Sequence, residues 1–159
     1  MQLSKHFKLE EFTKSMTAIR KGIKNEAGSG EIKNLTDVCY GVLEPVRAKF
    51  DKPVIVTSGY RSPELCEAIG SKSTSQHAKG QAVDFEIADV SNLQVALWIE
   101  NNCDFDQLIL EYYTGEANSG WIHCSFVEGS NRKQVLTYDG KQFTNGLPDA
   151  KWSGGKLQN

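Results

Sequence analysis

The sequence predicts an α+β domain in which an antiparallel sheet carries its helices on one face. Three observations predict this class. The 159 residues are 39% hydrophobic and 24% charged, which is typical of one globular domain. Apolar residues at helical spacing gather early in the chain, and apolar residues at strand spacing gather late. Helices and strands that are segregated in this way favour an α+β fold.

The first helices are expected before residue 51. Phe7 precedes a short helix-prone stretch at residues 9–13 and is expected to anchor it. The polar, glycine-bearing segment 21–30 predicts a loop. Residues 32–50 then predict a long helix, because their apolar residues recur at steps of three and four. Pro45 stands inside that stripe and is expected to bend the helix or to split its last turn.

A strand, a short helix and a loop are expected next. Residues 54–58 are mostly β-branched and follow Pro53, which predicts a strand. Pro63 can open a short helix that Gly70 ends. Residues 71–80 are polar and predict a loop.

The second half of the chain contains most of the predicted sheet. Residues 82–87 alternate as a strand does, and residues 91–102 predict an amphipathic helix with Ser91 as its N-cap. Three more strands are predicted at residues 106–111, 121–127 and 134–138. Beyond Gly140 the pattern dissolves. We therefore expect one domain over residues 1–140 and a loosely ordered tail over residues 141–159.

The composition argues against several classes of protein. A net charge of −2 lacks the basic footprint of a nucleic-acid binder, and no run of about 18 apolar residues predicts a membrane span. The N-terminus lacks the apolar stretch of a secretory signal. The cysteines have no CxxC spacing, so we expect free thiols in a reducing compartment, with disulfides as the alternative. We expect a monomer, made in the cytoplasm, without membrane insertion or nucleic-acid partners.

Three polar residues stand where a sheet can bring them together. In the predicted strand at 82–87, Asp84 lies on the face opposite Val83 and Phe85. In the strand at 121–127, His123 likewise lies opposite the apolar residues. If both apolar faces pack on the helices, Asp84 and His123 project together. His77 lies seven residues before Asp84, in a glycine-containing loop that can fold over the same face.

Two imidazoles and one carboxylate suit Zn²⁺. Three protein ligands leave the fourth position for water, which is typical of a catalytic site. Neutral histidines with one carboxylate leave the site positively charged, so that it lowers the pKa of a water molecule and polarises a carbonyl. The alternative is that these residues are ordinary polar groups of a structural protein, since each occurs singly on a strand or loop.

Three segments in this order resemble the signatures of the zinc D-Ala-D-Ala carboxypeptidase family. They are residues 58–62 (SGYRS), 75–85 (SQHAKGQAVDF) and 121–126 (WIHCSF). Residues 3–12 (LSKHFKLEEF) are similar to the start of small phage and bacterial members. That family includes phage endolysins and shares its metal-site architecture with the hedgehog signalling domain. The resemblance implies the fold predicted above, with a zinc cleft on the sheet face opposite the helices.

The resemblance also implies roles for individual residues. It implies that His77, Asp84 and His123 bind zinc and that Arg61 contacts the substrate. An arginine can pair with a carboxylate or clamp a peptide carbonyl; the alternative is a structural arginine that ties the turn together. Further candidates for substrate binding are Tyr60, Ser75, Gln76 and Trp121. For Ser75 and Gln76 we favour a role in holding the His77 loop, and for Trp121 core packing is an equal alternative.

One departure concerns the general base. Many family members carry Asp or Glu three residues before the last zinc-binding histidine, where this chain has Gly120. Glu111 ends the strand at 106–111 and is expected on the zinc face, opposite Leu108 and Leu110. We predict Glu111 as the general base, with Glu116 as an alternative. The additional catalytic histidine of the family has no counterpart here.

These observations lead to a functional hypothesis and a rival. The hypothesis is a zinc peptidase, phage-borne or released to the cell wall, that cleaves the stem peptides of peptidoglycan. The bond is D-Ala-D-Ala, as for a carboxypeptidase, or L-Ala-D-Glu, as for an endolysin-type endopeptidase. The rival is a zinc-bearing module that binds cell wall or protein without turnover, which Gly120 favours.

Overall fold

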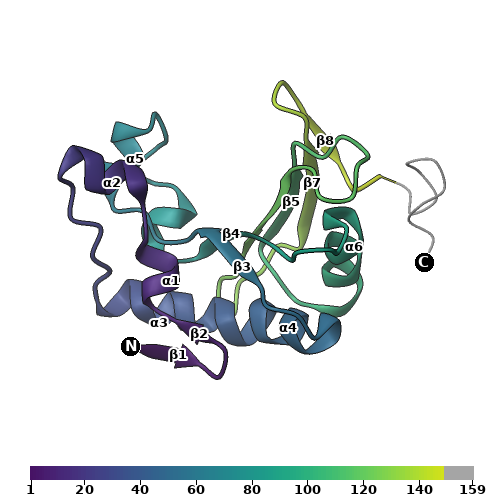
Figure 1. Ribbon diagram of the computed structural model, residues 1–159, viewed down its shortest axis with the longest axis horizontal. Helices are drawn as coiled ribbons and strands as arrows, with labels where there is room; N and C mark the ends of the chain where they lie inside the picture. The colour runs from purple at the N-terminus through teal and green to yellow at the C-terminus, as the bar shows by residue number, and fades with distance from the viewer. Residues whose placement is uncertain (149–159) are drawn as a thin grey trace.

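The computed structural model describes residues 1–148 and has a mixed six-stranded sheet with helices packed against it (Figure 1). The helices are α1 (Glu10–Thr13), α2 (Met16–Lys21), α3 (Ser29–Val38), α4 (Glu44–Phe50), α5 (Pro63–Ala68) and α6 (Asn92–Asn102). A π-helical turn η1 (Cys39–Leu43) joins α3 to α4, and a 3₁₀ turn η2 (Gln76–Lys79) precedes β4. The strands are β1 (Gln2–Ser4), β2 (Phe7–Lys8), β3 (Ile55–Ser58), β4 (Ala82–Glu86), β5 (Gln107–Glu111), β6 (Trp121–Ser125), β7 (Gln134–Tyr138) and β8 (Phe143–Asn145).

The sheet has the strand order β3-β4-β6-β5-β7-β8, and β1 and β2 form a separate hairpin. This architecture confirms the predicted α+β class. Every neighbouring pair in the large sheet is antiparallel except β5 and β7, which are parallel. The expectation of a fully antiparallel sheet therefore fails at this one pair. Both edges of β6 are already occupied by β4 and β5, so the chain that returns after β6 adds to the free edge of β5.

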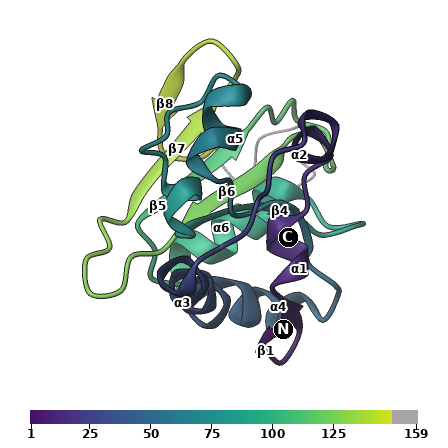
Figure 2. The same cartoon turned by 90° about the vertical axis from the view of Figure 1, so that its left-hand side faces the viewer.

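The long helix follows the predicted apolar stripe and changes its winding next to Pro45. Proline has no N–H to bond the carbonyl of Gly41, four residues earlier, and its ring crowds that carbonyl. The chain accommodates this by widening to π-helical bonding over Cys39–Leu43, with Glu44 N–H donating to the Cys39 carbonyl. The rod from α3 to α4 runs beneath the sheet in Figures 1 and 2.

The core lies between this rod, α6 and one face of the sheet. The inward residues of the central strands are fully buried, namely Val83, Phe85, Leu108, Leu110, Ile122 and Cys124. All four cysteines are buried free thiols, as expected. Since the apolar side chains alternate along each strand, the polar side chains between them are left on the opposite face.

Three segments differ from the sequence-based expectation, the first being residues 2–8, which form the β1–β2 hairpin. Residues 16–21 form α2, with the Ser15 hydroxyl accepting from Ala18 N–H at its start and Gly22 ending it. Residues 143–145 form β8 on β7, although we expected a loose tail from residue 141. The cause is a turn in which the Asp139 carboxylate accepts from the N–H groups of Lys141 and Gln142. The remainder of the predicted tail, residues 149–159, lies outside the described residues.

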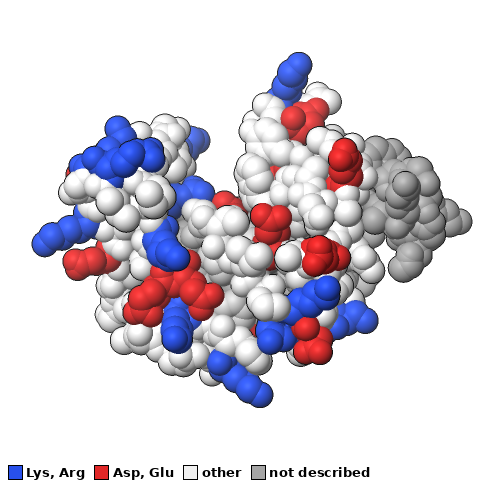
Figure 3. Space-filling view, viewed as in Figure 1, with Lys and Arg blue, Asp and Glu red and all other residues white. Residues whose placement is uncertain are grey.

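None of the helices in residues 1–148 combines the length and apolar character that a membrane span requires. The surface is hollowed between the part that carries α2 and α5 and the part that carries β7 and β8 (Figure 3). Figure 1 places β4 at the base of that hollow in the same view.

Candidate metal centre

Two neighbouring strands and one short turn hold the three predicted metal ligands. Asp84 in β4 and His123 in β6 are direct cross-strand partners, so both side chains leave the sheet on the same face. His77 lies in η2, which begins where the Ser75 hydroxyl accepts from His77 N–H and ends at Gly80 in a left-handed conformation (φ +74°). The structure therefore brings the three side chains together: Asp84 and His123 share a face, as strand alternation predicted, and the loop of His77 folds over it.

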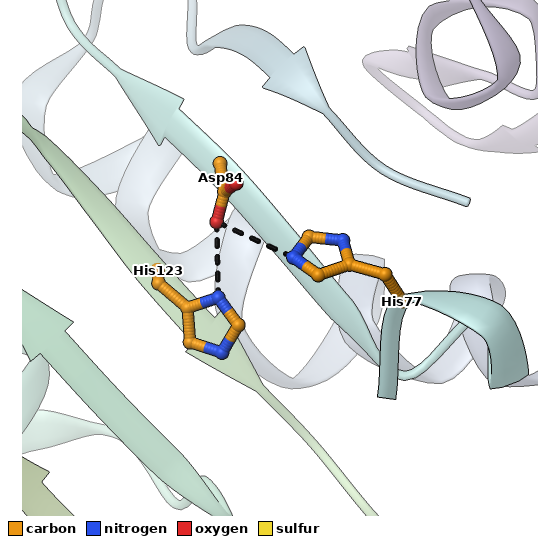
Figure 4. Close-up of side chains that lie close together, drawn as sticks. All are labelled: His77, Asp84 and His123. Carbon is orange, nitrogen blue, oxygen red and sulfur yellow. Dashed lines mark hydrogen bonds and ion pairs between the residues drawn. The ribbon is translucent and has the colours of Figure 1, made fainter. Parts of the chain in front are cut away.

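Both imidazoles approach the same carboxylate oxygen (Figure 4). His123 Nδ1 lies 3.0 Å from Asp84 Oδ1, and His77 Nε2 lies 3.6 Å from it. The three donor atoms all lie within 4.8 Å of one another. Zinc bound tetrahedrally at about 2.0–2.1 Å holds its ligand atoms about 3.3 Å apart. The measured distances of 3.0 and 3.6 Å from Asp84 Oδ1 lie on either side of this value, so two imidazole nitrogens and one carboxylate oxygen arranged in this way fit a zinc ion.

The ring of His77 is fixed in the tautomer that metal binding needs. Its Nδ1 lies 2.7 Å from the carbonyl oxygen of Gly59. A carbonyl only accepts, so Nδ1 carries the proton and the lone pair of Nε2 faces Asp84. Burial also lowers the pKa of His77, although Asp84 opposes this effect, and a low pKa favours the neutral ring.

The carboxylate of Asp84 is held from its other side by Arg61. Arg61 Nη2 donates to Asp84 Oδ2 at 3.2 Å, and Arg61 Nε donates to Ser58 Oγ at 2.9 Å. Oδ1 is thereby left facing the histidines. Burial raises the pKa of Asp84, but the hydrogen bond with His123 and the nearby ring of His77 outweigh it and hold the pKa well below its usual range. The carboxyl is therefore ionised, as a metal ligand must be.

Glu111 stands beside this cluster at the end of β5. Its Oε2 lies 4.0 Å from His123 Nδ1, and its side chain is 19% exposed. Burial raises the pKa of Glu111, while the neighbouring His123 opposes the rise. A partly buried carboxylate with a raised pKa next to a metal site suits a general base. Glu116, the alternative candidate, lies exposed in the turn before β6.

Gly120 explains why the acidic residue cannot come from that position. Its φ is +67°, and a Cβ placed there would overlap the carbonyl oxygen of Glu111 and crowd the backbone of Tyr112 and Tyr113. The Asn92 side chain also donates to the Gly120 carbonyl at 3.1 Å, which fixes this turn. The close approach excludes any side chain at residue 120. Glu111 of the neighbouring strand β5 places its carboxylate beside His123 instead.

The other predicted substrate residues lie around the cluster in different settings. Ser75 caps η2, and Gln76 Nε2 donates to Asp106 Oδ2 at 2.8 Å, so both hold the loop of His77. The Tyr60 side chain is buried at 6% exposure. Trp121 pairs with Glu111 across the strands, and its ring centroid lies 5.0 Å from that of Tyr112. A contact of these residues with substrate stays a prediction.

Several supporting residues were not found by sequence reasoning. Gly59 fixes the tautomer of His77 through its carbonyl, which no side-chain pattern reveals. Asp106 accepts from Arg132 Nε and Nη2, both at 2.9 Å, as well as from Gln76, and so ties the His77 loop to β5. The only signal in the sequence for this role of Asp106 was its place just before an apolar strand. Its partner Arg132, 26 residues further on, gave none.

One family model matches the chain. It is the model described as Peptidase M15, and it covers residues 5–125. The matched span contains the three clustered side chains as well as Arg61 and Glu111. No curated protein gives a significant match to the sequence.

Proposed function

Because the chain belongs to the peptidase M15 family, we propose that it is a zinc peptidase that hydrolyses a peptide bond in the stem peptides of peptidoglycan. The observation that carries the proposal is the convergence of three donor atoms within 4.8 Å of one another, beside a partly buried glutamate. A structural zinc site would use four protein ligands, whereas three leave a position for water or substrate.

The residues that would hold the ion are His77 through Nε2, Asp84 through Oδ1 and His123 through Nδ1. When bound there, zinc supplies a Lewis acid that polarises a peptide carbonyl and makes a water molecule more acidic. The protein contributes the orientation of the ligands. Gly59 fixes one imidazole, and Arg61 fixes the carboxylate.

Glu111 is the proton carrier in this proposal. Its Oε2 takes a proton from the attacking water, the remaining hydroxide bonds to the carbonyl carbon, and the proton passes to the amine as the C–N bond breaks. The glutamate ends unprotonated and ready for the next turnover. The raised pKa of Glu111 makes it a stronger base than an exposed carboxylate.

Arg61 has a second proposed role, toward the substrate. Two of its five N–H donors are used by Ser58 and Asp84, and the side chain is 21% exposed. The remaining donors suit a substrate carboxylate or the oxyanion that develops on the carbonyl. A free terminal carboxylate at this position makes the enzyme a D-Ala-D-Ala carboxypeptidase. If Arg61 instead binds an internal peptide carbonyl, the enzyme is an endopeptidase, for example one that cleaves the L-Ala-D-Glu bond. On this proposal the protein acts at the cell wall as a monomer. It reaches the wall as phage enzymes do, by release from the cell or as part of the phage particle.

Digestion of purified peptidoglycan tests the proposal. The zinc-loaded protein should release new amino groups without new reducing sugars, and a chelator should abolish the release until zinc is restored. Glu111→Gln should retain zinc and lose about 10²–10⁴-fold in rate, the usual contribution of a general base. Glu116→Gln is the matched control and should retain the wild-type rate. Mass spectrometry of the fragments distinguishes released D-alanine from larger peptides.

Two results would count against the proposal. If zinc-loaded protein releases no amines from any type of wall, the chain is a binding module without turnover. If Glu111→Gln keeps its activity, Glu111 is not the base.

A further inference from the structure

A groove runs from Arg61 between α2 and α5. Its volume is about 460 Å³, and its floor includes Val56 and Ser58 of β3. This volume is typical of ligand sites, which span roughly 300–1,000 Å³. Arg61 lines the groove and also donates to Asp84. Arg61 is therefore the residue shared by the two sites: it lines the groove at one end and contacts a ligand of the metal cluster through Asp84.

The floor of the groove belongs to an edge strand. β3 is the terminal strand of the large sheet and pairs only with β4. Among the described residues, those at 55–58 make no backbone hydrogen bond outside this pairing. The edge ends near Tyr60, whose N–H donates to the Phe12 carbonyl of α1. An unpaired edge of this kind can accept an added extended peptide, which pairs with its free N–H and C=O groups.

The two helices present apolar side chains beside this edge. Met16 and Ile19 of α2 are 69% and 72% exposed, and Ile69 beyond α5 is 44% exposed. All three line the groove. Met16 and Ile19 are three residues apart and share one face of their helix. Exposed apolar residues that are clustered in this way indicate a binding surface. Figure 2 looks onto this side of the molecule, with α2 and α5 both above α1.

The charges of the groove favour an acidic ligand. Lys14 and Arg61 are its cations, and Lys14 makes no ion pair within residues 1–148. Glu11 is the acid in the lining, and its carboxylate accepts from the N–H of Lys8. Lysines and arginines also gather over α2 (Figure 3). Stem peptides carry carboxylate groups, and a peptide of this kind is complementary to the lining of the groove.

We infer that the groove between α2 and α5 is an extended binding site in which the part of the peptide remote from the scissile bond lies along the open edge of β3. The inference rests on the proposed function and specifies how its substrate is held. Peptide length should therefore matter for affinity, because residues away from the metal cluster contact Ile19, Met16 and Ile69.

Peptide binding to the zinc-loaded Glu111→Gln protein tests the inference without turnover. The probes are synthetic stem peptides of two, three, four and five residues, measured by calorimetry. Ile19→Glu is the groove variant, and Tyr40→Glu is its control, since Tyr40 is 64% exposed in η1 and lies outside the groove lining. Both sites are exposed, so neither substitution disturbs the core. Hydrogen exchange at residues 55–58 is measured with and without the longest peptide.

The expected result is an affinity that rises with peptide length in the parent and in Tyr40→Glu. Ile19→Glu should bind the five-residue peptide at least fivefold more weakly and the dipeptide equally well, and exchange at residues 55–58 should slow on binding. If Ile19→Glu binds every peptide as the parent does, or if those amides stay unprotected, the groove assignment is wrong while wild-type hydrolysis of peptidoglycan still stands. If the parent binds no peptide and the wild type cleaves no wall, both the inference and the proposed function are overturned.

Discussion

Replacement of Gly120 by alanine tests the packing that joins the turn before β6 to the general base. Gly120 has a left-handed backbone (φ +67°), and an added Cβ would overlap the carbonyl oxygen of Glu111. It would also crowd the backbone of Tyr112 and Tyr113. These are backbone atoms, so they cannot rotate away as the end of a side chain can. Relief requires that the end of β5 moves, and Glu111 moves with it.

The magnitude follows from two contributions. A left-handed conformation costs alanine about 1–2 kcal/mol. The steric overlap adds about 1–3 kcal/mol, as overpacking does in a close-packed region. The free energy of unfolding should fall by about 2–5 kcal/mol, and the Tm by roughly 5–15 °C for a domain of this size. Gly22→Ala is the matched control, because Gly22 has φ +66° and nothing within 4 Å of the added Cβ. It should lose only the conformational contribution.

Urea denaturation of both variants measures the difference, and amine release from peptidoglycan measures the effect on Glu111. At a temperature where both variants are folded, Gly120→Ala should be the less active. Gly120→Asp should be as unstable and should not regain a base. Equal destabilisation of Gly120→Ala and Gly22→Ala would refute the reasoning, because it would mean that Gly120 is needed only for its backbone conformation.

Three further predictions concern the metal, acid stability and the thiols. His123→Ala should lose the bound zinc, which metal analysis of the dialysed protein checks; full retention of zinc would contradict the ligand set. The hydrogen bonds from Arg132 lower the pKa of Asp106 to about 2 in the folded protein, so its contribution is complete above about pH 4 and is lost as the pH falls toward 2. Because Arg132 is 58% exposed, we expect Asp106→Asn to cost about 1–2 kcal/mol at pH 6 and much less at pH 2 in urea titrations; an equal cost at both pH values would contradict this. The buried thiols should react with a water-soluble disulfide reagent only in denaturant, since each is buried and burial raises the pKa of Cys39 to about 12; rapid reaction of the native protein would show that a thiol is accessible.

The site could be located from the sequence because strands alternate. Val83 and Phe85 had to face the core, so Asp84 had to face away, and the same reasoning applied to His123. The prediction that Glu111 lies on that face had the same basis, and its 4.0 Å distance to His123 agrees with it. The helix at residues 91–102 was predicted as well, because Ser91 provides its N-cap hydrogen bond locally.

The features that sequence reasoning missed have different causes, one from the assembled sheet and two from local signals that were weak or overlooked. β7 pairs with β5 in parallel because β6 has no free edge, which is a property of the assembled sheet. The large apolar residues of α2, Met16 and Ile19, are exposed and only Ala18 is buried, so no core-facing stripe marked this short helix. β8 was overlooked although Asp139-Gly140 is a strong hairpin signal.

The sequence by itself determined the residue types of the metal centre and the sheet face on which they stand, since both follow from local alternation between apolar and polar positions. Only the tertiary structure decided which atoms meet. Arg61 bonds Asp84 across 23 residues, Gly59 fixes the ring of His77 across 18, and Gly120 packs on the backbone of the strand that bears Glu111. Contacts of this kind depend on strand pairing and on the close approach of backbones, which a pattern of side chains along the chain does not specify.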